Sequence, residues 1–377
     1  MKPQLSATEK LRLAVRLLTV APLKLSYYAA QLALFAVRNR LPVRLYVKCA
    51  TARFALGSLS AREVQYMQPG TEEAYRSWMK DKARRTPDRV RLEPDVQRLD
   101  SADGGAILWM GNRRAASKVV LFFHGGGFCI PAGRGHFEWC WNAYVQTGME
   151  TGVEVAVAFL RYSLSPEARF PVQLRQQVAA LKAILASGLP PSDIIIGGDS
   201  AGGNLVTQLL GHILHPHPDV DSIQLSRPLA GAFAVSPWLS CDTNMRGFRE
   251  NGRSDMLCAQ SIQSLALTYF GSEAALHSAQ RGQNGWVLPM DADETWLLGV
   301  DALVSSLYVT AGSREVLVDD ARWLVRALKA ANCEVLFHEA GGEAHDFVLL
   351  EGDVAEVGEA TKRIKEWFRS VIVSRTG

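Results

Sequence analysis

Short apolar runs alternate with longer helix-like segments from about residue 90 onwards. Six runs are apolar on both faces of a strand, and they lie at residues 119–123, 154–160, 193–198, 229–236, 303–312 and 333–340. Helix-like segments such as 170–187 and 319–331 lie between them. Strands of this kind, separated by helices, are typical of a mostly parallel sheet that is covered on both sides. The pattern therefore predicts an α/β fold, in which ligands bind beyond the carboxyl ends of the strands.

The first 40 residues follow a different pattern. Residues 10–40 are rich in leucine, alanine and aromatic side chains, but basic residues interrupt them, and the longest uncharged run is residues 25–37. This run is shorter than the roughly 20 residues that a bilayer-spanning helix needs. No small-residue cleavage site closes a charge-free segment, as it would in a secretory signal peptide. We therefore predict two amphipathic helices that are broken near Pro22, rather than a membrane span or a cleaved leader.

Positive charge is concentrated in the same part of the chain. Residues 1–65 contain eleven Lys or Arg and two Glu, although the formal net charge of the whole chain is only +3. Two compatible roles follow for the helices of residues 1–92. They are predicted to form a cap over a larger domain. Their basic surface, which also carries Leu, Tyr and Phe, is hypothesised to make a peripheral contact with an anionic membrane.

The larger domain is predicted to span residues 93–377 and to contain an insertion. The segment between the fourth and fifth apolar runs is too long for a simple crossover connection. We interpret residues 240–298 as a helical insertion that contributes to a lid or a pocket wall. Seven mostly aromatic side chains are candidates for the wall of an apolar pocket or, alternatively, ordinary core residues: Phe128, Cys129, Phe137, Trp139, Trp141, Trp238 and Trp286.

Composition and cysteine usage restrict the class of protein. Of the 377 residues, 48% are hydrophobic and 21% are charged, which is ordinary for a globular protein and excludes a disordered chain. The small net charge argues against a nucleic-acid partner. Six cysteines are scattered without CxxC spacing, so we expect no metal site, and free thiols in a reducing compartment. We predict a cytoplasmic protein that is not secreted, with a peripheral contact to an intracellular membrane such as the endoplasmic reticulum.

The strongest chemical signal follows the apolar run at 193–198. Gly198-Asp199-Ser200-Ala201-Gly202 has the form G-x-S-x-G and lies between that strand and a helical stretch. Such a turn holds its serine in a strained conformation, with the hydroxyl exposed at the top of the sheet. The alternative is a glycine-rich turn without catalysis, but the strand-turn-helix context favours Ser200 as a nucleophile.

A second glycine-rich motif follows the strand at 119–123. His124-Gly125-Gly126-Gly127 brings three consecutive glycines to a strand end, where backbone amides can face a small anion. Acyl transfer needs such donors for its oxyanion. A flexible turn or a phosphate cradle are the alternatives, and the chain lacks the motifs typical of a phosphate cradle. His124 is expected to brace the loop.

A nucleophilic serine needs a base, and the base needs an acid partner. His345 follows the strand at 333–340, which places it at the same sheet edge as Ser200. Glu315 comes three residues after the strand at 303–312 and is the preferred acid. Asp319 and Asp320 are alternatives, although their position favours capping of the next helix.

These motifs together resemble the hormone-sensitive-lipase-like branch of the α/β-hydrolase fold. The resemblance is carried by HGGGF, YSLSPE, GDSAGGN and AHDF, with a Glu three residues after a strand, and it covers residues 95–377. It implies a mostly parallel sheet flanked by helices, with a helical cap from the N-terminus. It also implies a nucleophile, acid and base at Ser200, Glu315 and His345. The oxyanion amides would come from three further residues, Gly126, Gly127 and Ala201.

The chain departs from the family pattern in two places. The family often has Asp where Glu315 stands, and its D-Y-R-L-A-P-E segment reads Arg161-Tyr162-Ser163-Leu164-Ser165-Pro166-Glu167 here. The second change bears on local salt bridges rather than on the three catalytic positions. The basic N-terminal region and the Trp-rich insertion look similar to fungal members of the branch, some of which belong to secondary-metabolite pathways and others to steryl-ester deacetylation.

The sequence thus predicts a serine hydrolase that cleaves a hydrophobic small-molecule ester through an acyl-enzyme, without a metal or organic cofactor. A non-hydrolytic enzyme on the same scaffold, such as a cyclase or a C–C bond-modifying enzyme, is the main alternative. A catalytically silent binding protein is disfavoured because Ser200, Glu315 and His345 are all present. The oligomeric state is not indicated.

Overall fold

The computed structural model describes residues 3–85, 92–99, 104–282, 284–292, 294–353 and 357–373. Its centre is one sheet with the strand order β1-β2-β4-β3-β5-β6-β7-β8. The strands are β1 (Asp95–Arg98), β2 (Ala106–Met110), β3 (Lys118–Phe123), β4 (Val155–Arg161), β5 (Ile194–Asp199), β6 (Gly231–Val235), β7 (Leu307–Gly312) and β8 (Val335–Ala340). The six predicted strands are confirmed as β3 to β8, which pair in parallel. The antiparallel β1 and β2 were not predicted.

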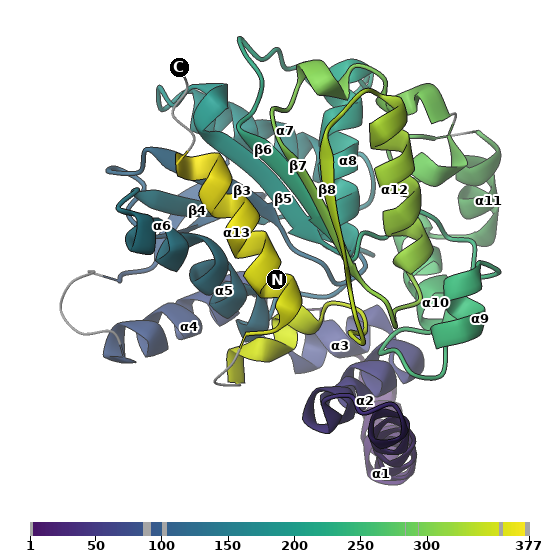
Figure 1. Ribbon diagram of the computed structural model, residues 1–377. Helices are drawn as coiled ribbons and strands as arrows, with labels where there is room; N and C mark the ends of the chain where they lie inside the picture. The colour runs from purple at the N-terminus through teal and green to yellow at the C-terminus, as the bar shows by residue number, and fades with distance from the viewer. Residues whose placement is uncertain are drawn as a thin grey trace.

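Helices cover both faces of the sheet (Figure 1). The helices of the first half are α1 (Ala7–Arg38), α2 (Val43–Ser58), α3 (Ala61–Met67), α4 (Thr71–Arg85), α5 (Arg134–Cys140), α6 (Gln146–Thr151) and α7 (Val172–Leu185). Those of the second half are α8 (Ala201–Leu214), α9 (Arg246–Asn251), α10 (Ala259–Phe270), α11 (Glu273–Arg281), α12 (Val318–Ala330) and α13 (Glu359–Val373). A π-helical turn joins α5 to α6, and a 3-10 segment, Phe347–Asp353, precedes α13.

The alternation of side chains along each strand divides the interior into two cores. On β3, Val119, Leu121 and Phe123 belong to the core that also contains α7, α8 and α12. Val120 and Phe122 belong to the opposite core, which is shared with α4, α5 and α13. Successive side chains of a strand point to opposite faces, so a strand that is covered on both faces has to be apolar throughout. This is the physical origin of the runs in the sequence.

The N-terminal region contains one long helix instead of the two that were predicted. Helix α1 runs through Pro22 without a break and begins with a capping box formed by Ser6 and Glu9. Pro22 is exposed, so its ring lies away from the packed side of the helix. The buried side, with Leu32 and Ala36 among its residues, packs against α2, and this packing offsets the one backbone hydrogen bond that proline removes. The prediction of a break near Pro22 is therefore wrong.

Figure 1 places α1, α2 and α3 below the sheet, at the end where β5 and β8 finish. The insertion between β6 and β7 contains α9, α10 and α11, and α10 contacts α2. The N-terminal helices and the insertion thus approach the carboxyl ends of the strands from two directions. In an open α/β sheet this is the edge at which ligands bind.

Candidate active site

Ser200 lies in a sharp turn between β5 and α8, with φ 52° and ψ −117°. The turn is possible only because the residues two positions before and after Ser200 are glycines, which have no Cβ atom. A Cβ atom on Gly198 would lie 2.4 Å from the Phe123 carbonyl oxygen, and one on Gly202 would lie 1.9 Å from the same atom. The Ser200 amide donates to the Val235 carbonyl at 2.8 Å, which anchors the turn to β6. The packed surroundings therefore maintain a backbone conformation that is strained for serine.

The glycine loop after β3 lies against this turn. Gly126 and Gly127 have φ values of 98° and 59°, in the left-handed region that favours glycine. Gly125 donates its amide to Asp199 Oδ2 at 3.0 Å, and a Cβ there would lie 2.3 Å from that oxygen. In the described part of the chain, the Gly126 and Gly127 amides donate to no protein acceptor. Ala201 is the first residue of α8, so its backbone amide has no hydrogen-bond acceptor within the helix.

His124 is packed inside the glycine loop. Its Nδ1 is 2.8 Å from the Gly125 carbonyl oxygen, and its ring stacks on Tyr162 with a centroid distance of 4.3 Å. The Tyr162 hydroxyl donates to the His124 carbonyl at 2.8 Å. Burial lowers the pKa of His124 to about 3, so its imidazole is neutral in the physiological pH range. These contacts suit a residue that braces the loop, and they keep its ring away from proton transfer.

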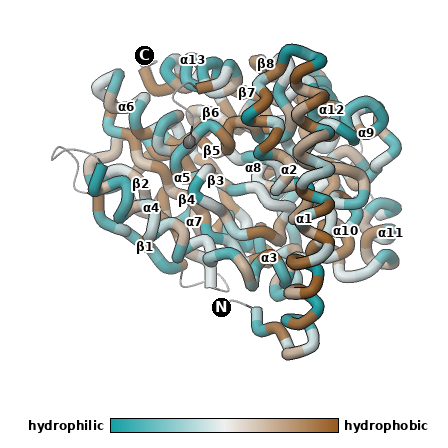
Figure 2. Tube along the Cα trace, turned by 90° about the horizontal axis from the view of Figure 1, so that it is seen from below, coloured by the Kyte–Doolittle hydropathy of each residue, from teal (hydrophilic) through white to brown (hydrophobic). Residues whose placement is uncertain are grey.

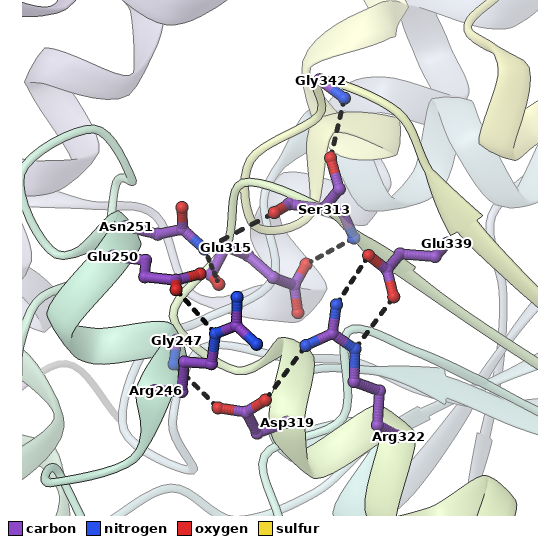
Figure 3. Close-up of polar contacts among 11 residues, drawn as sticks. Arg246, Gly247, Glu250, Asn251, Ser313, Glu315, Asp319, Arg322, Glu339 and Gly342 are labelled. Carbon is purple, nitrogen blue, oxygen red and sulfur yellow. Dashed lines mark hydrogen bonds and ion pairs between the residues drawn. The ribbon is translucent and has the colours of Figure 1, made fainter.

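His345 and Ser200 line the same cavity, and Glu315 lies behind His345. Glu315 is fully buried, and its Oε1 is 3.8 Å from His345 Nδ1. Its Oε2 accepts hydrogen bonds from the Ser236 hydroxyl at 2.6 Å and from the Gly312 amide at 2.9 Å. Figure 3 shows Glu315 with its neighbours Asn251 and Ser313. Three residues from the ends of β5, β7 and β8 are thus brought to one edge of the sheet.

The other ring nitrogen of His345 contacts a residue that the sequence analysis did not select. Nε2 is 3.1 Å from Asp346 Oδ2, and among the described residues no hydrogen bond joins it to the Ser200 hydroxyl. Burial disfavours the imidazolium, but the carboxylates of Asp346 and Glu315 outweigh this effect and raise the pKa of His345 well above its usual value. Burial also raises the pKa of Asp346. The imidazole is therefore enclosed between two carboxyl groups.

Two further polar residues support these loops and were also missed. Ser236 directly follows β6 and has φ 45°, so attention to every strand end could have identified it. Asp255 comes from the loop between α9 and α10. Its carboxylate accepts the backbone amides of His345 and Val316, at 3.0 and 2.8 Å. Nothing in the sequence around Asp255 indicates this role.

Asp319 and Asp320 lie in the first turn of α12, one of the two positions expected for them, but neither is its N-cap residue. The residue before the helix is Leu317, and it makes no side-chain cap. Asp319 accepts the Gly247 amide at 2.7 Å and pairs with Arg322 (Figure 3). Asp320 is buried and accepts the amides of the segment after β6, at 2.7 and 3.0 Å. Both carboxylates accept backbone amides of the segment between β6 and β7, and they thereby connect the first turn of α12 to the insertion.

The cavity beside Ser200 has a volume of about 200 Å³ and a mainly apolar wall. Its apolar lining comes from the N-terminal helices, the loop after β3, the segment between β6 and β7, and the segment after His345: Ala52, Ala55, Leu56, Val64, Ile130, Trp238, Met256, Leu257, Ile262, Leu265, Leu349 and Leu350. Of the seven predicted wall residues, Trp238 alone is among the described lining residues. Phe137, Trp139 and Trp141 belong to the core on the opposite face of the sheet, where their rings make tilted or edge-on contacts with aromatic residues of β3, β4, β6 and α4.

Within the described residues, no group of three or more His, Cys, Asp or Glu side chains is arranged to hold a metal ion. The polar side chains that line the cavity are those of the serine turn and the histidine loop, together with Gln68 and His136, and His136 Nε2 is 3.4 Å from Asp199 Oδ2. A serine hydroxyl at the carboxyl ends of the strands, an imidazole and free backbone amides around an apolar cavity can support acyl transfer.

Comparisons with known proteins agree with this chemistry. A family model described as the alpha/beta hydrolase fold matches residues 120–349. An acetyl-hydrolase of Streptomyces hygroscopicus is 27% identical over 234 residues, which is 61% of this chain and 68% of that protein. Lipase 2 of Moraxella sp. (strain TA144) is 39% identical over 279 residues, 67% of this chain and 60% of that protein. The solved structure of an esterase from the bacterial hormone-sensitive lipase family has 25% identity and a TM-score of 0.62, and the match covers 87% of this chain and 98% of that one.

Proposed function

The chain belongs to the alpha/beta hydrolase family, and from this we propose that it is a serine carboxylic-ester hydrolase that acts on hydrophobic small-molecule esters. One observation carries the proposal: Ser200, in its strained turn, shares an apolar cavity with His345 and with the glycine loop of Gly126 and Gly127. The relatives are named an acetyl-hydrolase and a lipase, and the structural neighbour is named an esterase. These names favour an ester bond as the target.

In the proposed reaction, the Ser200 hydroxyl attacks the ester carbonyl carbon while His345 Nε2 accepts the hydroxyl proton. The imidazolium then returns this proton to the leaving alcohol, and water hydrolyses the acyl-enzyme by the same route. For the first step, Nε2 has to exchange its contact with Asp346 for one with Ser200. Glu315, next to Nδ1, would hold the ring in the tautomer that leaves Nε2 free to accept a proton.

The amides of Gly126, Gly127 and Ala201 are proposed as the oxyanion hole. The first two have no protein acceptor among the described residues and lie in the loop that lines the cavity. Ala201 adds the first amide of α8, whose N-terminal dipole also favours negative charge. Each such donor typically contributes about 10²- to 10³-fold to turnover.

The substrate is proposed to place one apolar group in the cavity. A volume of about 200 Å³ is smaller than the roughly 300 Å³ at which pockets for whole drug-sized ligands begin. The cavity therefore suits the acyl part or the alcohol part of an ester, with the rest of the molecule outside. Its wall of Leu, Ile, Ala, Val, Met and Trp side chains favours a hydrocarbon group over a charged one.

Replacing Asp346 with Asn is expected to shift the acid limb of the pH profile to lower pH. The base has to be neutral, so kcat/KM falls when the pH drops below the pKa of His345. The Asp346 carboxylate raises that pKa, so its removal lowers the pKa and preserves the neutral imidazole in more acidic solution. Glu315 and Asp255 still face His345 in the variant. A shift of the acid limb to lower pH is expected when kcat/KM is measured as a function of pH. An unchanged acid limb, or one shifted upwards, would contradict this assignment.

We also propose that α1 makes a peripheral contact with an anionic intracellular membrane, from the cytoplasmic side. Large apolar side chains are exposed along the helix, with Leu18 and Leu23 at 78% and 75% exposure, and Figure 2 shows the helix largely in brown. Among the described residues, α1 is the one helix long and apolar enough to span a membrane by length and composition, and 17% of its apolar window is buried. Packing of α1 along α2 favours a helix that lies on the surface.

The double variant Leu18→Glu, Leu23→Glu is expected to lose most binding to phosphatidylserine-containing vesicles in a sedimentation assay. Both side chains are exposed, so turnover of a soluble nitrophenyl ester is expected to stay unchanged. Equal sedimentation of the two proteins would refute the peripheral contact. Retention of the native protein in a carbonate-washed membrane fraction would instead indicate that α1 spans the bilayer.

The test of the proposed function is turnover of p-nitrophenyl butyrate, together with covalent labelling by a fluorophosphonate probe. Turnover that depends on Ser200 supports hydrolysis. Labelling of Ser200 without turnover of any nitrophenyl ester would favour the alternative, a cyclase or a C–C bond-modifying enzyme of a secondary-metabolite pathway that uses the same groups on a reactive intermediate.

A further inference from the structure

The insertion between β6 and β7 is attached directly to the loop that carries Glu315. The Asn251 side-chain amide, at the end of α9, donates to the Glu315 carbonyl at 2.9 Å (Figure 3). At the start of the same helix, the Gly247 amide donates to Asp319 at 2.7 Å. A Cβ atom on Gly247 would lie 2.4 Å from the Val316 carbonyl oxygen, so the two backbones are in close contact. Helix α9 therefore lies along the segment of residues 315–319.

The loop of residues 252–258, between α9 and α10, extends this contact to the histidine. Asp255 is fully buried, and its carboxylate accepts three backbone amides. Oδ1 accepts those of Met256 at 2.6 Å and His345 at 3.0 Å, and Oδ2 accepts that of Val316 at 2.8 Å. One side chain thus fixes the backbone of the proposed base and that of the residue after the proposed acid. Glu315 and His345 come from different strands, and Asp255 connects them.

The position of Asp255 is energetically costly. It lies near another buried carboxyl group, that of Glu315, and burial raises its own pKa to about 6. A buried carboxylate is tolerated when backbone amides satisfy it, and losing one of these partners leaves an unpaired polar group. The hydrogen bonds from His345 and Val316 are therefore strongly constrained.

The same loop is held from the other side by the N-terminal helices. Arg53, on α2, donates to the backbone carbonyls of Gly252, Asp255 and Leu257. On α1, the Gln31 side chain donates to the Arg253 carbonyl at 2.6 Å. Helix α2 also reaches the histidine loop directly, because the Tyr46 hydroxyl donates to the Gly342 carbonyl at 2.9 Å.

We propose that Asp255 is a positioning residue that sets the relative placement of Glu315 and His345, and that Arg53 couples this placement to the seating of the N-terminal helices. The proposal rests on the proposed roles of Glu315 and His345. The distance from His345 Nδ1 to Glu315 Oε1 is 3.8 Å, so a small movement of either loop decides whether these two atoms form a hydrogen bond. The N-terminal helices therefore contribute to turnover as well as to the wall of the cavity.

The test compares Asp255→Asn and Arg53→Met with two matched controls. Asn at position 255 keeps one acceptor oxygen but puts a donor in place of the other, so one of the three amides loses its partner. Met at position 53 keeps the apolar stem and removes the guanidinium. Glu351→Gln is the control for a buried carboxylate, since Glu351 accepts the Gly358 amide and the Thr361 hydroxyl. Arg16→Met is the control for an N-terminal arginine, since Arg16 donates to the Ser58 carbonyl and to Glu63.

The thermal midpoint of unfolding is measured for each protein. The values of kcat and KM for p-nitrophenyl butyrate and the rate constant of fluorophosphonate labelling are then measured at a temperature well below the lowest midpoint. Asp255→Asn and Arg53→Met are expected to lower kcat by about 10- to 100-fold and to slow labelling by a similar factor, with KM within about threefold. The two controls are expected to lower the midpoint and to keep kcat within about twofold.

Wild-type kcat in both Asp255→Asn and Arg53→Met, with only a lower midpoint, would overturn the proposal. If Asp255→Asn does not fold, the kcat and labelling rate of Arg53→Met decide in the same way. A Ser200→Ala variant that still turns over ester would contradict the proposed function itself, which separates the two failures.

Discussion

Replacement of Ser200 with alanine is expected to lower kcat for p-nitrophenyl butyrate by about 10⁶-fold, a loss typical of removing the nucleophile of a serine hydrolase. Alanine has no hydroxyl to attack the carbonyl carbon, so no acyl-enzyme forms. The residue lines the cavity, and within the described part of the chain its hydroxyl makes no hydrogen bond, so the substitution removes no contact of the fold there. The measurement is ester turnover, with mass spectrometry of the fluorophosphonate adduct on the intact protein.

A suitable control is Ser187→Ala, at the end of α7, where the hydroxyl donates only to the Ile184 carbonyl. This variant is expected to keep both turnover and labelling. Labelling that survives in Ser200→Ala would identify another nucleophile and reject the mechanism. Cys129 is a poor candidate for that role, because burial raises the pKa of its thiol far above the physiological range.

The central sheet could be predicted because its strands are buried on both faces. Each of β3 to β7 is buried along nearly its whole length, so an apolar residue is required at nearly every position and the run is visible in the sequence. The edge strand β1 lacks this support, because it is four residues long and only partly buried, so it does not stand out from the surrounding polar segments. β2 is apolar and buried along its whole length, so the same signal is present at Ala106–Met110 and the prediction overlooked it.

The loops of the site could be predicted for steric reasons. Gly125, Gly198 and Gly202 are at positions where any Cβ atom would overlap the neighbouring backbone or Asp199, so these residues appear as a conspicuous glycine pattern. A hydrogen bond between distant residues leaves no such pattern. Asp255 contacts the loops of Glu315 and His345 only after the insertion has folded onto them, whereas Ser236 directly follows β6 and meets Glu315 from the neighbouring strand end. Their roles depend on tertiary contacts that a local reading of the sequence does not contain.

The wrong prediction of a helix break and the open choice for the tryptophans have a related cause. Pro22 was expected to break the first helix because proline removes a backbone hydrogen bond, but α1 is stabilised along its length by packing on α2. For several tryptophans the sequence left two alternatives open, the wall of an apolar pocket and the core, because aromatic residues are common in both. Trp139 and Trp141 fill the core beneath the opposite face of the sheet. In both cases tertiary packing determines the outcome, a continuous helix in the first and a core position in the second, and the local sequence does not contain this information.

Replacement of Glu315 with Gln is expected to lower kcat by about 10⁴-fold, and the contacts of Glu315 explain why. Oε2 accepts the Gly312 amide and the Ser236 hydroxyl, so the amide oxygen of Gln has to occupy that side. The NH₂ group then faces His345 Nδ1 and favours the tautomer in which Nδ1 accepts and Nε2 carries the proton. That tautomer cannot take a proton from Ser200. Glu315→Asp keeps the charge and is expected to retain more activity, and Glu339→Gln, which removes a partly exposed ion pair with Arg322, is the neutralisation control. If Glu315→Gln keeps kcat within about tenfold, Glu315 is not the orienting acid, and the carboxylate of Asp346 would be the next to test.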